Sequence, residues 1–498
     1  MAIIYVKSGS TGNGSAWNNA YGSLQSAITA AQAGDEIWVA AGTYKPTTGT
    51  DRTASFTLKN NVAIYGGFAG TETARNQRNI ATNVTILSGE IGAINNTADN
   101  SIHVVTADNT TNTTILDGFT ITRGNGNSFG ANQGGGGGVV ILNSSPILRN
   151  IIFENNLGIF GSAFAQNYNS NATLTNIIFR NNSAISGGGY NGNGGAIYNE
   201  RSNLTLTDVT FINNTSTVFG GAISNSSGAN INLINATFSN NNATNNGGAI
   251  YNSNTASSGT GAAPSSSNIT LINTTFNNNT SPSGGAIYNT GSTSNVINST
   301  FTRNTGNSGS VINSASGTSN VRNSIIWGNS GTALSGVNTV TNSIVQGGFT
   351  GTGNLNVDPL FIDAINNNLR LQSNSPAINV GNNSFLPADT SDLDKDGNTT
   401  ETIPFDLAGN PRVNGTNVDL GAYEFVSVQN RPPVVNDAVF SISKTSPNGT
   451  VVGTINATDP DNNPLTYSIT DGNPDTDGDN IKAFAIRSCR VRVCGDNL

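Results

Sequence analysis

The sequence contains very few of the residues that most catalytic and transition-metal sites use. Its 498 residues include 1 histidine, 1 methionine and 2 cysteines, and the cysteines, Cys489 and Cys494, lie close to the C-terminus. The body of the chain therefore has no disulfide framework, and a metal site built from cysteine and histidine is disfavoured. A disulfide across the short Cys489–Cys494 interval has no supporting pattern.

Charge and long apolar runs are also scarce. Charged residues make up 10% of the chain, the formal net charge is −8, and the lysines and arginines form no dense patch. A nucleic-acid or other phosphate-binding surface is therefore not expected. No apolar run is long enough to predict a membrane span. Residues 1–20 lack a charged start followed by an apolar core, so no signal peptide is expected; an incomplete start, another export signal and an internal location all stay open.

Glycine, asparagine, serine and threonine are abundant, a composition that on its own can indicate disorder. Apolar triplets such as Ile151-Ile152-Phe153 and Ile177-Ile178-Phe179 recur through the middle of the chain, however. Each triplet supplies side chains that can be buried. The sequence therefore predicts a folded chain with many turns.

Two short phrases repeat between residues 150 and 310. The first is F-x-x-N and the second is Gly-Gly-Ala-Ile. They recur roughly every 26 residues, with two longer intervals that fit loop insertions, and this periodicity is typical of a solenoid. F-x-x-N begins at Phe153, Phe179, Phe211, Phe238, Phe276 and Phe301, and Gly-Gly-Ala-Ile begins at Gly194, Gly220, Gly247 and Gly284.

The segments between these phrases predict strands and not helices. Residues 204–211 and 231–238 alternate apolar and polar side chains, whereas an α-solenoid needs sustained helical periodicity. Inward side chains would stack on the same position in the next coil, about 4.8 Å away. Asparagine after each phenylalanine suits a left-handed turn, and stacked amides can bond coil to coil. We therefore predict a parallel β-helix.

The first coil of a solenoid has no neighbour to cover its core, so a cap is expected there. Ser23 can cap a helix whose Leu24, Ala27, Ile28 and Ala31 share one face. We predict an amphipathic capping helix within residues 1–60.

The repeated phrases resemble those of the polymorphic outer membrane protein repeat family, which belongs to the pectin-lyase-like right-handed β-helix class. Residues 374–425 resemble the closing segment of bacterial surface β-helix proteins, through Asn374-Ser-Pro-Ala-Ile-Asn-Val-Gly, Asp406-Leu-Ala-Gly-Asn-Pro-Arg412 and Asp419-Leu-Gly-Ala-Tyr-Glu424. The resemblance implies an all-β chain with a right-handed parallel β-helix over residues 1–428. The closing segment is expected over residues 358–428.

Beyond a proline-stiffened linker at 429–433, residues 434–498 resemble a bacterial cadherin-like repeat, a partial β-sandwich. The resemblance implies calcium ligands at Asp459 and Asp461, and a further acidic turn carries Asp475, Asp477 and Asp479. Lys444 stands where such repeats usually carry a ligating glutamate, which opposes calcium there. The last residues, 487–498, do not continue the pattern and fit a truncated or frame-shifted end.

Acidic residues are too sparse on the predicted coils to favour catalysis. Glycoside hydrolysis needs two carboxylates flanking the bond, and between residues 118 and 357 only Glu154, Glu200 and Asp208 are acidic. Glu154 and Asp208 have different offsets from their phenylalanines, so they are not expected to pair. His103, the single histidine, is expected in a turn or on a strand surface. We predict no catalytic residue and no bound organic cofactor.

Calcium is the cation that the remaining acidic pattern favours. Asp392, Asp394 and Asp396 alternate along Asp392-Leu-Asp-Lys-Asp-Gly397, and oxygen ligands at this spacing can surround one ion. Glu401 falls two residues short of the last EF-hand ligand position, so the loop is not an EF-hand. An acidic surface turn without metal is the alternative.

These features predict a non-enzymatic surface or secreted protein that serves as a stalk or adhesion module, with a calcium-binding cadherin-like segment. We expect an extracellular or cell-surface location, with other surface proteins or a polysaccharide as partners. The alternative is a carbohydrate-active β-helix that binds or cleaves polysaccharide. Stacked aromatic side chains together with convergent carboxylates in one groove would favour the alternative.

Overall fold

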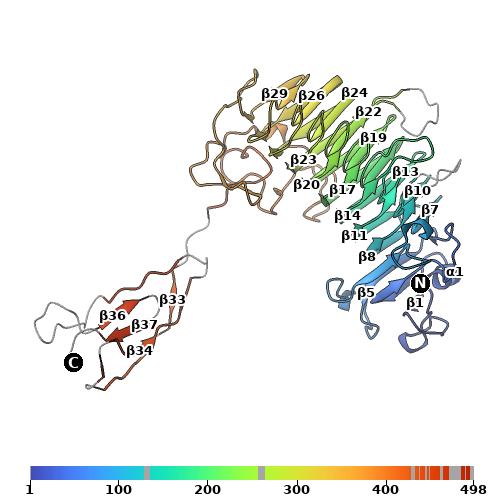
Figure 1. Ribbon diagram of the computed structural model, residues 1–498, viewed down its shortest axis with the longest axis horizontal. Coiled ribbons are helices and arrows are strands. Elements are labelled where there is room, and N and C mark those ends of the chain that lie inside the picture. The colour runs from blue at the N-terminus through green and yellow to red at the C-terminus, as the bar shows by residue number, and fades with distance from the viewer. Residues whose placement is uncertain are drawn as a thin grey trace, which may run out of the picture. The chain divides into compact units, whose positions relative to one another are not determined.

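The chain forms a long right-handed parallel β-helix followed by a smaller unit. The computed structural model describes residues 2–127, 135–255 and 264–427 and, in the second unit, 432–436, 438–443, 446–447, 449–459, 464–469, 484–487 and 490–493. The two compact units are Met1–Phe425 and Val426–Leu498. Figure 1 shows the strands of the first unit stacked in chain order.

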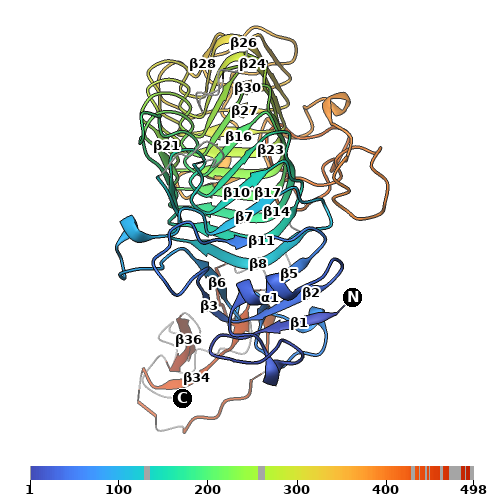
Figure 2. The ribbon, with the colours of Figure 1, turned by 90° about the vertical axis from the view of Figure 1, so that its right-hand side faces the viewer.

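A helix closes the N-terminal end of the stack, as the sequence predicts. Helix α1 (Leu24–Ala30) buries Leu24, Ala27 and Ile28, and the Ser23 side chain accepts a hydrogen bond from the Ser26 amide. Figure 2 shows α1 across the first strands. The first strands are β1 (Ile3–Val6), β2 (Glu36–Ala40), β3 (Gly42–Tyr44), β4 (Phe56–Thr57), β5 (Ala63–Phe68) and β6 (Thr85–Ser88). The short 3-10 helices are η1 (Trp17–Asn19), η2 (Arg75–Gln77), η3 (Thr97–Asp99) and η4 (Asn383–Phe385).

Each regular coil contains three strand segments in parallel register with the next coil. One face consists of β7 (Val105–Asp108), β10 (Val139–Leu142), β13 (Phe164–Asn167), β16 (Ile197–Glu200), β19 (Ile223–Ser226), β22 (Ile250–Ser253) and β24 (Ile287–Ile297). The long strands are β8 (Ile115–Thr122), β11 (Ile147–Glu154), β14 (Asn171–Arg180), β17 (Asn203–Ile212), β20 (Asn230–Ser239) and β23 (Asn268–Asn277). A narrow third sheet consists of β9 (Asn125–Gly126), β12 (Leu157–Gly158), β15 (Ser183–Ala184), β18 (Thr215–Ser216) and β21 (Asn242–Ala243).

The stack continues past the clearest repeats into less regular coils. These contain β25 (Thr300–Thr302), β26 (Ile312–Arg322), β27 (Ile325–Ile326), β28 (Leu334–Ser335), β29 (Thr339–Thr341) and β30 (Ile344–Val345). The closing segment then adds the antiparallel pair β31 (Phe361–Asp363) and β32 (Asn368–Leu371). Strands of the second unit are antiparallel: β33 (Val434–Val435), β34 (Val451–Thr454), β35 (Ala457–Thr458), β36 (Phe484–Arg487) and β37 (Arg490–Val493).

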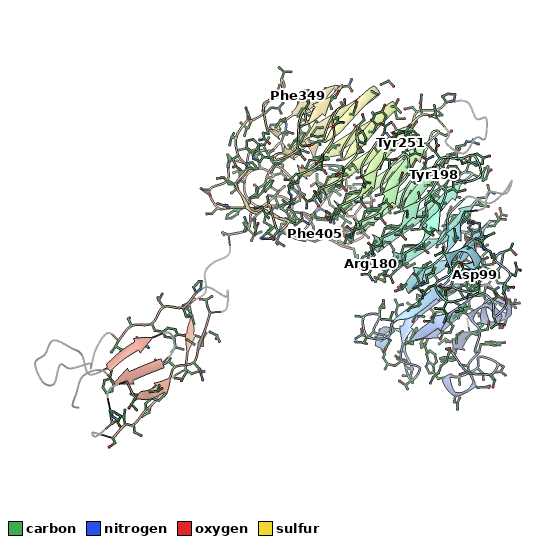
Figure 3. The ribbon with its side chains drawn as sticks, in the orientation of Figure 1. Asp99, Arg180, Tyr198, Tyr251, Phe349 and Phe405 are labelled. Atoms are coloured by element: carbon green, nitrogen blue, oxygen red, sulfur yellow. The ribbon has the colours of Figure 1, made fainter. Side chains whose placement is uncertain are left out.

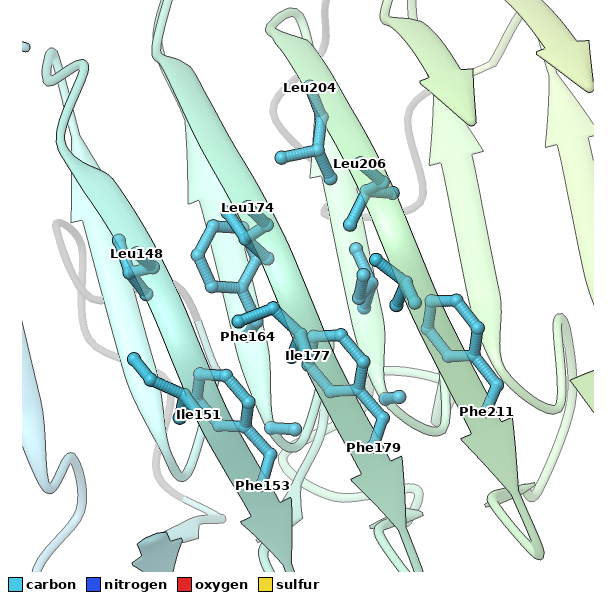
Figure 4. Close-up of a cluster of buried hydrophobic side chains, with 14 of the residues drawn as sticks. Leu148, Ile151, Phe153, Phe164, Leu174, Ile177, Phe179, Leu204, Leu206 and Phe211 are labelled. Atoms are coloured by element: carbon cyan, nitrogen blue, oxygen red, sulfur yellow. The ribbon is translucent and has the colours of Figure 1, made fainter. Parts of the chain in front are cut away.

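The phenylalanine of F-x-x-N forms a column through the core. Adjacent rings from Phe153 to Phe301 stack with centroids 4.5 to 4.9 Å apart and nearly parallel planes. Figure 4 shows Phe153, Phe179 and Phe211 in this row, beside stacked isoleucines and leucines. The regular spacing follows from the strand separation, because each ring occupies the same register position in successive coils.

The second and third positions after each phenylalanine have different roles, and both are asparagine in five of the six repeats. The asparagine at the second position, such as Asn181 or Asn213, adopts positive φ, which asparagine tolerates better than most residues. The asparagine at the third position is fully buried, and its amide nitrogen donates to the amide oxygen of the next coil, as Asn214 does to Asn241 at 3.0 Å. The same amide also donates to the carbonyl of Phe179 at 2.9 Å. The buried asparagines therefore join the coils along their axis.

Candidate metal centre

The Asp-rich loop belongs to the closing segment and is held together at its neck. Ala388 and Thr402 form an antiparallel bridge. The Asp389 amide donates to the carbonyl of Glu401 at 2.7 Å, which places these two acids side by side at the base of the loop. Sequence reasoning did not select either residue as a ligand, because 11 positions separate them and only the closed neck brings them together.

Tight turns fold the rest of the loop around Asp394. Asp392 and Lys395 have φ values of 50° and 62°, and Gly397 has 84°. The Asp392 carboxylate accepts from the Gly397 amide at 3.1 Å, and the Asp396 carboxylate accepts from Asn398 at 2.7 Å. These bonds between side chain and backbone keep the alternating aspartates close together.

The carboxylates converge in two overlapping groups that share Asp394. Oxygen atoms of Asp392, Asp394 and Asp396 lie within 4.8 Å of one another, and so do those of Asp389, Asp394 and Glu401. The structure therefore brings together all three loop aspartates that the sequence singles out and adds two acids to them. Among the described residues, no other group of three carboxylates has this geometry.

Several carboxylate oxygens in this cluster have no hydrogen-bond partner. Asp389 is 0% exposed and its Oδ1 is unpartnered, although its Oδ2 accepts from the Leu393 amide at 2.7 Å. Both side-chain oxygens of Glu401 are buried and unpartnered. Desolvation raises the pKa of Glu401, and the negative charges of Asp396, Asp394 and Asp389 raise it further. Buried carboxylate oxygens destabilise the fold when they lack hydrogen-bond donors and when they repel one another. A bound cation would offset both the missing donors and the repulsion.

The donor set fits calcium better than magnesium. Calcium takes six to eight oxygen ligands at about 2.3–2.6 Å, so two ligands on opposite sides of one ion lie roughly 4.6–5.2 Å apart. The oxygen separations in both groups do not exceed 4.8 Å, so the oxygens of each group can reach one ion of this size. Magnesium needs near-ideal octahedral geometry, which a loop of carboxylates on tight turns does not offer. The residues present can hold calcium, with Asp394 at the centre.

The acids of the second unit stay a prediction. Asp459 follows β35 and is partly exposed. Asp461, Asp475, Asp477 and Asp479, and also Lys444, Cys489 and Cys494, lie outside the described residues.

The three acids on the coils each have a separate partner. Glu154 forms an ion pair with Arg180 at 2.5 Å, Glu200 accepts from the Tyr198 hydroxyl at 2.9 Å, and Asp208 accepts from Asn235 at 3.1 Å. A column of Phe219, Tyr251 and Tyr288 is stacked on the face formed by β22 and β24. An aromatic column of the kind that the alternative function needs is therefore present, whereas the three acids each bond to a different partner.

The expectation for His103 is wrong in one respect. The residue lies outside the strands, but it is 7% exposed and not on the surface. Its Nδ1 bonds to the Gly136 carbonyl at 2.5 Å, and burial lowers the pKa of the imidazole. A lone polar residue in an irregular segment carries no periodic signal for its burial, so the sequence could not indicate it.

A second charge cluster, unpredicted as a cluster, anchors the closing segment. Arg412 is 1% exposed, and its guanidinium lies 2.6 Å from Glu424. Asp406 accepts from the Glu424 amide at 2.8 Å, and Asp419 accepts from Phe425 at 2.6 Å. Arg412 also donates to Asn273 of β23 at 3.2 Å. These residues are the ones conspicuous in the closing-segment motifs, so the motifs encode a buried ionic lock between this segment and the coils.

Figure 3 shows the side of the stack that the closing segment occupies. Phe405 lies along one side, and Tyr198 and Tyr251 lie along the other. The carbonyl of Phe405 accepts from Asn273 at 2.8 Å, which places the closing segment over the long strands. The candidate metal centre and the aromatic column are thus on different faces.

Comparison with protein families finds four repeats in the middle of the coils. Residues 176–200, 208–226, 235–253 and 273–290 match the Chlamydia polymorphic membrane protein repeat. These segments contain the F-x-x-N and Gly-Gly-Ala-Ile phrases. The chain therefore carries polymorphic membrane protein-type repeats on a right-handed parallel β-helix. A search of curated proteins gives no match.

Solved structures with some similarity include two lyases and an adhesin. Pectate lyase Pel9A has a TM-score of 0.48 and 16% identity over 85% of this chain and 96% of its own. A rhamnogalacturonan lyase has a TM-score of 0.39 and 12% identity, covering 73% and 91%. PfbA, a surface adhesin of Streptococcus pneumoniae, has a TM-score of 0.22 and 11% identity over 60% of this chain and 84% of its own. The fold assignment rests on the parallel register of the coils.

Proposed function

We propose that this chain is a non-enzymatic surface or secreted protein in which the β-helix is a stiff stalk and adhesion module. The repeats support this proposal, since they match a repeat named for membrane proteins of Chlamydia. Within the described residues, no helix is both long and apolar enough to cross a membrane. An extracellular or cell-surface location is part of the proposal, as is a cadherin-like role for residues 434–498.

The closing segment binds calcium in this proposal. The observation that carries it is the fully buried Asp389 carboxylate, which has one unpartnered oxygen and lies within 4.8 Å of the carboxylates of Asp394 and Glu401. Calcium would bind to these three acids and to Asp392 and Asp396. A bound ion stabilises the folded state by about 2.7 kcal/mol at a free concentration 100 times its Kd.

Thermal melting with calcium and with chelator tests the metal site. Millimolar calcium should raise the melting temperature of the full chain, and Asp394→Asn should abolish this rise because Asp394 belongs to both groups. Asp108→Asn, an exposed aspartate of β7, is the matched control and should keep the rise. An unchanged melting temperature in the wild-type chain at millimolar calcium would contradict the calcium site.

A screen on polysaccharides tests the non-enzymatic part. The purified chain is incubated with neutral and acidic polysaccharides, with and without calcium, and both product release and binding are measured. We expect binding without turnover. Product release that tracks the purified chain would contradict the proposal and would favour a carbohydrate-active β-helix.

A further inference from the structure

A groove runs between the long strands and the Asp-rich loop. It has a volume of about 830 Å³. Its floor is the outer face of β11, β14 and β17, and one wall consists of residues 390–393 and 395. This size is in the range of ligand-binding clefts, about 300–1,000 Å³.

The floor carries four threonines in a regular array; Thr173, Thr175 and Thr205 are partly exposed, whereas Thr207 is 7% exposed. Thr173 pairs with Thr205 and Thr175 pairs with Thr207 in the parallel register of β14 and β17. Adjacent strands are about 4.8 Å apart and alternate residues about 6.6 Å apart, so the array is nearly rectangular. In the described part of the chain, no hydrogen bond engages any of these four hydroxyls. The hydroxyls of the three partly exposed threonines can therefore both donate to a ligand and accept from it.

The same position in the next coils shows that the stacking of the coils does not require threonine there. The position of Thr175 and Thr207 is occupied by Ile234 in β20 and Ile272 in β23. Those isoleucines pack with Leu393 and Ile403, residues of the closing segment. This register position is therefore isoleucine where the closing segment packs on the strands, and threonine where the groove leaves the strands uncovered.

The charges that line the groove balance each other. Arg149 and Lys395 are exposed cations that form no ion pair with any described residue, and Asp208 and Asp392 are the acids. Balanced charges do not favour a polyanion, and Leu393 is the single large apolar side chain in the lining. The lining thus suits a neutral ligand rich in hydroxyl groups.

The groove and the candidate metal centre share a residue. Asp392 lines the groove and also belongs to the carboxylate group around Asp394. Leu393, next to it, anchors the loop on the strands. Calcium on the carboxylates would therefore fix the wall that faces the threonines.

We propose that this groove binds a short stretch of a neutral polysaccharide, and that calcium on the Asp-rich loop is required for tight binding. The proposal rests on the calcium site proposed above and deepens it by naming the class of ligand. Threonine hydroxyls of β14 and β17 contact the sugar hydroxyls, and the loop covers one side of the bound chain.

The test measures binding of the full chain to soluble neutral polymers (a β-glucan, a galactomannan and a dextran), with polygalacturonate as the acidic comparison. Thr175→Val and Thr205→Val keep the side-chain shape and remove one hydroxyl each. Each should weaken binding of the preferred neutral polymer by about tenfold, the effect of about 1.4 kcal/mol lost from hydrogen bonding. Chelator should weaken the wild-type chain at least as much.

Thr270→Val is the matched control. Thr270 of β23 occupies the same register column as Thr205, is likewise partly exposed, and does not line the groove. It should leave binding unchanged. Equal weakening by Thr270→Val, tighter binding of polygalacturonate, or binding of proteins but of no neutral polymer would each overturn the groove proposal.

Melting data separate this proposal from the one on which it rests. A calcium-dependent rise in melting temperature with no binding of any neutral polymer overturns the groove and leaves the metal site standing. Polymer binding that is equal in calcium and in chelator overturns the calcium requirement. Turnover of a polymer contradicts the non-enzymatic function, whatever the groove variants do.

Discussion

Gly221, the second glycine of one Gly-Gly-Ala-Ile phrase, has no room for a side chain. A Cβ atom there would lie 2.1 Å from the carbonyl oxygen of Gly248 in the next coil. The first glycine, Gly220, has a φ of 64°, a left-handed conformation that glycine adopts at little cost. The phrase is therefore required by backbone contact between coils and by a turn, and it has no role in chemistry.

Substitution of Gly221 measures this contact. Gly221→Ala should lower the free energy of unfolding by about 1–3 kcal/mol, because the coils must separate to admit the methyl group. Chemical denaturation of the full chain gives the value. Gly49→Ala is the control, since a Cβ at Gly49 meets one atom at 3.5 Å, an ordinary contact distance. A stability loss no larger than that of the control would contradict the contact.

At the scale of elements, two asparagine ladders differ in burial. Asn241 is 0% exposed and bonds to Asn214, Asn279 and the backbone. Asn230 belongs to an exposed ladder and donates to Asn203 at 2.7 Å. The asparagines of the buried ladder make the hydrogen bonds that water cannot make to the backbone groups at each turn. The asparagines of the exposed ladder can bond to water instead of to one another.

The two ladders provide a matched pair of substitutions. Asn241→Ala should lower the free energy of unfolding by about 1–3 kcal/mol for each buried polar group that it leaves without a hydrogen-bond partner. Asn230→Ala should change stability by less than about 0.5 kcal/mol, as is usual for surface positions. Denaturant titration of both variants measures the difference. Similar losses for the two would show that burial does not set the strength of the ladder.

The ionic lock of the closing segment is an element whose stability depends on pH. Burial raises the pKa of Glu424 to about 8, against an ordinary value of 4.5, although Arg412 opposes the rise. Between these values the folded chain keeps a proton that the unfolded chain has released. The contribution of Glu424 to stability is therefore fully present below about pH 4.5 and is lost as the pH rises towards 8.

Glu424→Gln should remove this dependence, because glutamine stays neutral throughout. Melting curves between pH 5 and pH 8 compare the variant with the wild-type chain. The wild-type melting temperature should fall more over this interval than that of the variant. Glu154→Gln, which alters a more exposed ion pair with Arg180, is the control and should follow the wild type. Parallel curves for Glu424→Gln and wild type would contradict the retention of a proton by Glu424 in the folded chain.

At the scale of the whole molecule, the chain divides into two compact units. The candidate calcium loop lies entirely in the first unit, at residues 389–401. Units with separate cores can unfold separately, so a single unfolding temperature need not describe the chain.

Calorimetry of the full chain should therefore show two transitions. Calcium at low millimolar concentration should raise the transition of the first unit, which is the larger, and Asp394→Asn should cancel that rise. Ion binding to one folded unit stabilises that unit by mass action. A calcium response confined to the smaller transition would place the metal in residues 426–498 instead.

The repeat phrases alone determined the regular part of the fold. The same phrase recurs after 26 and 32 residues, so Phe153, Phe179 and Phe211 reach one register position, and parallel coils stacked in that register bury all of them. The capping helix was equally readable, because Ser23 and the apolar face of Leu24 and Ile28 are local signals. Local periodicity was sufficient for both features.

The positions at which the functional groups meet depend on the tertiary structure. The sequence identified Asp392, Asp394 and Asp396 by their spacing, but Asp389 and Glu401 joined them through a closed loop neck. Arg412 met Asn273 across 139 residues, and the loop wall met threonines of β14 and β17 in the same way. Periodicity fixes which side chains point outward, whereas the contacts of an irregular segment folded back on the coils depend on packing that no local pattern encodes.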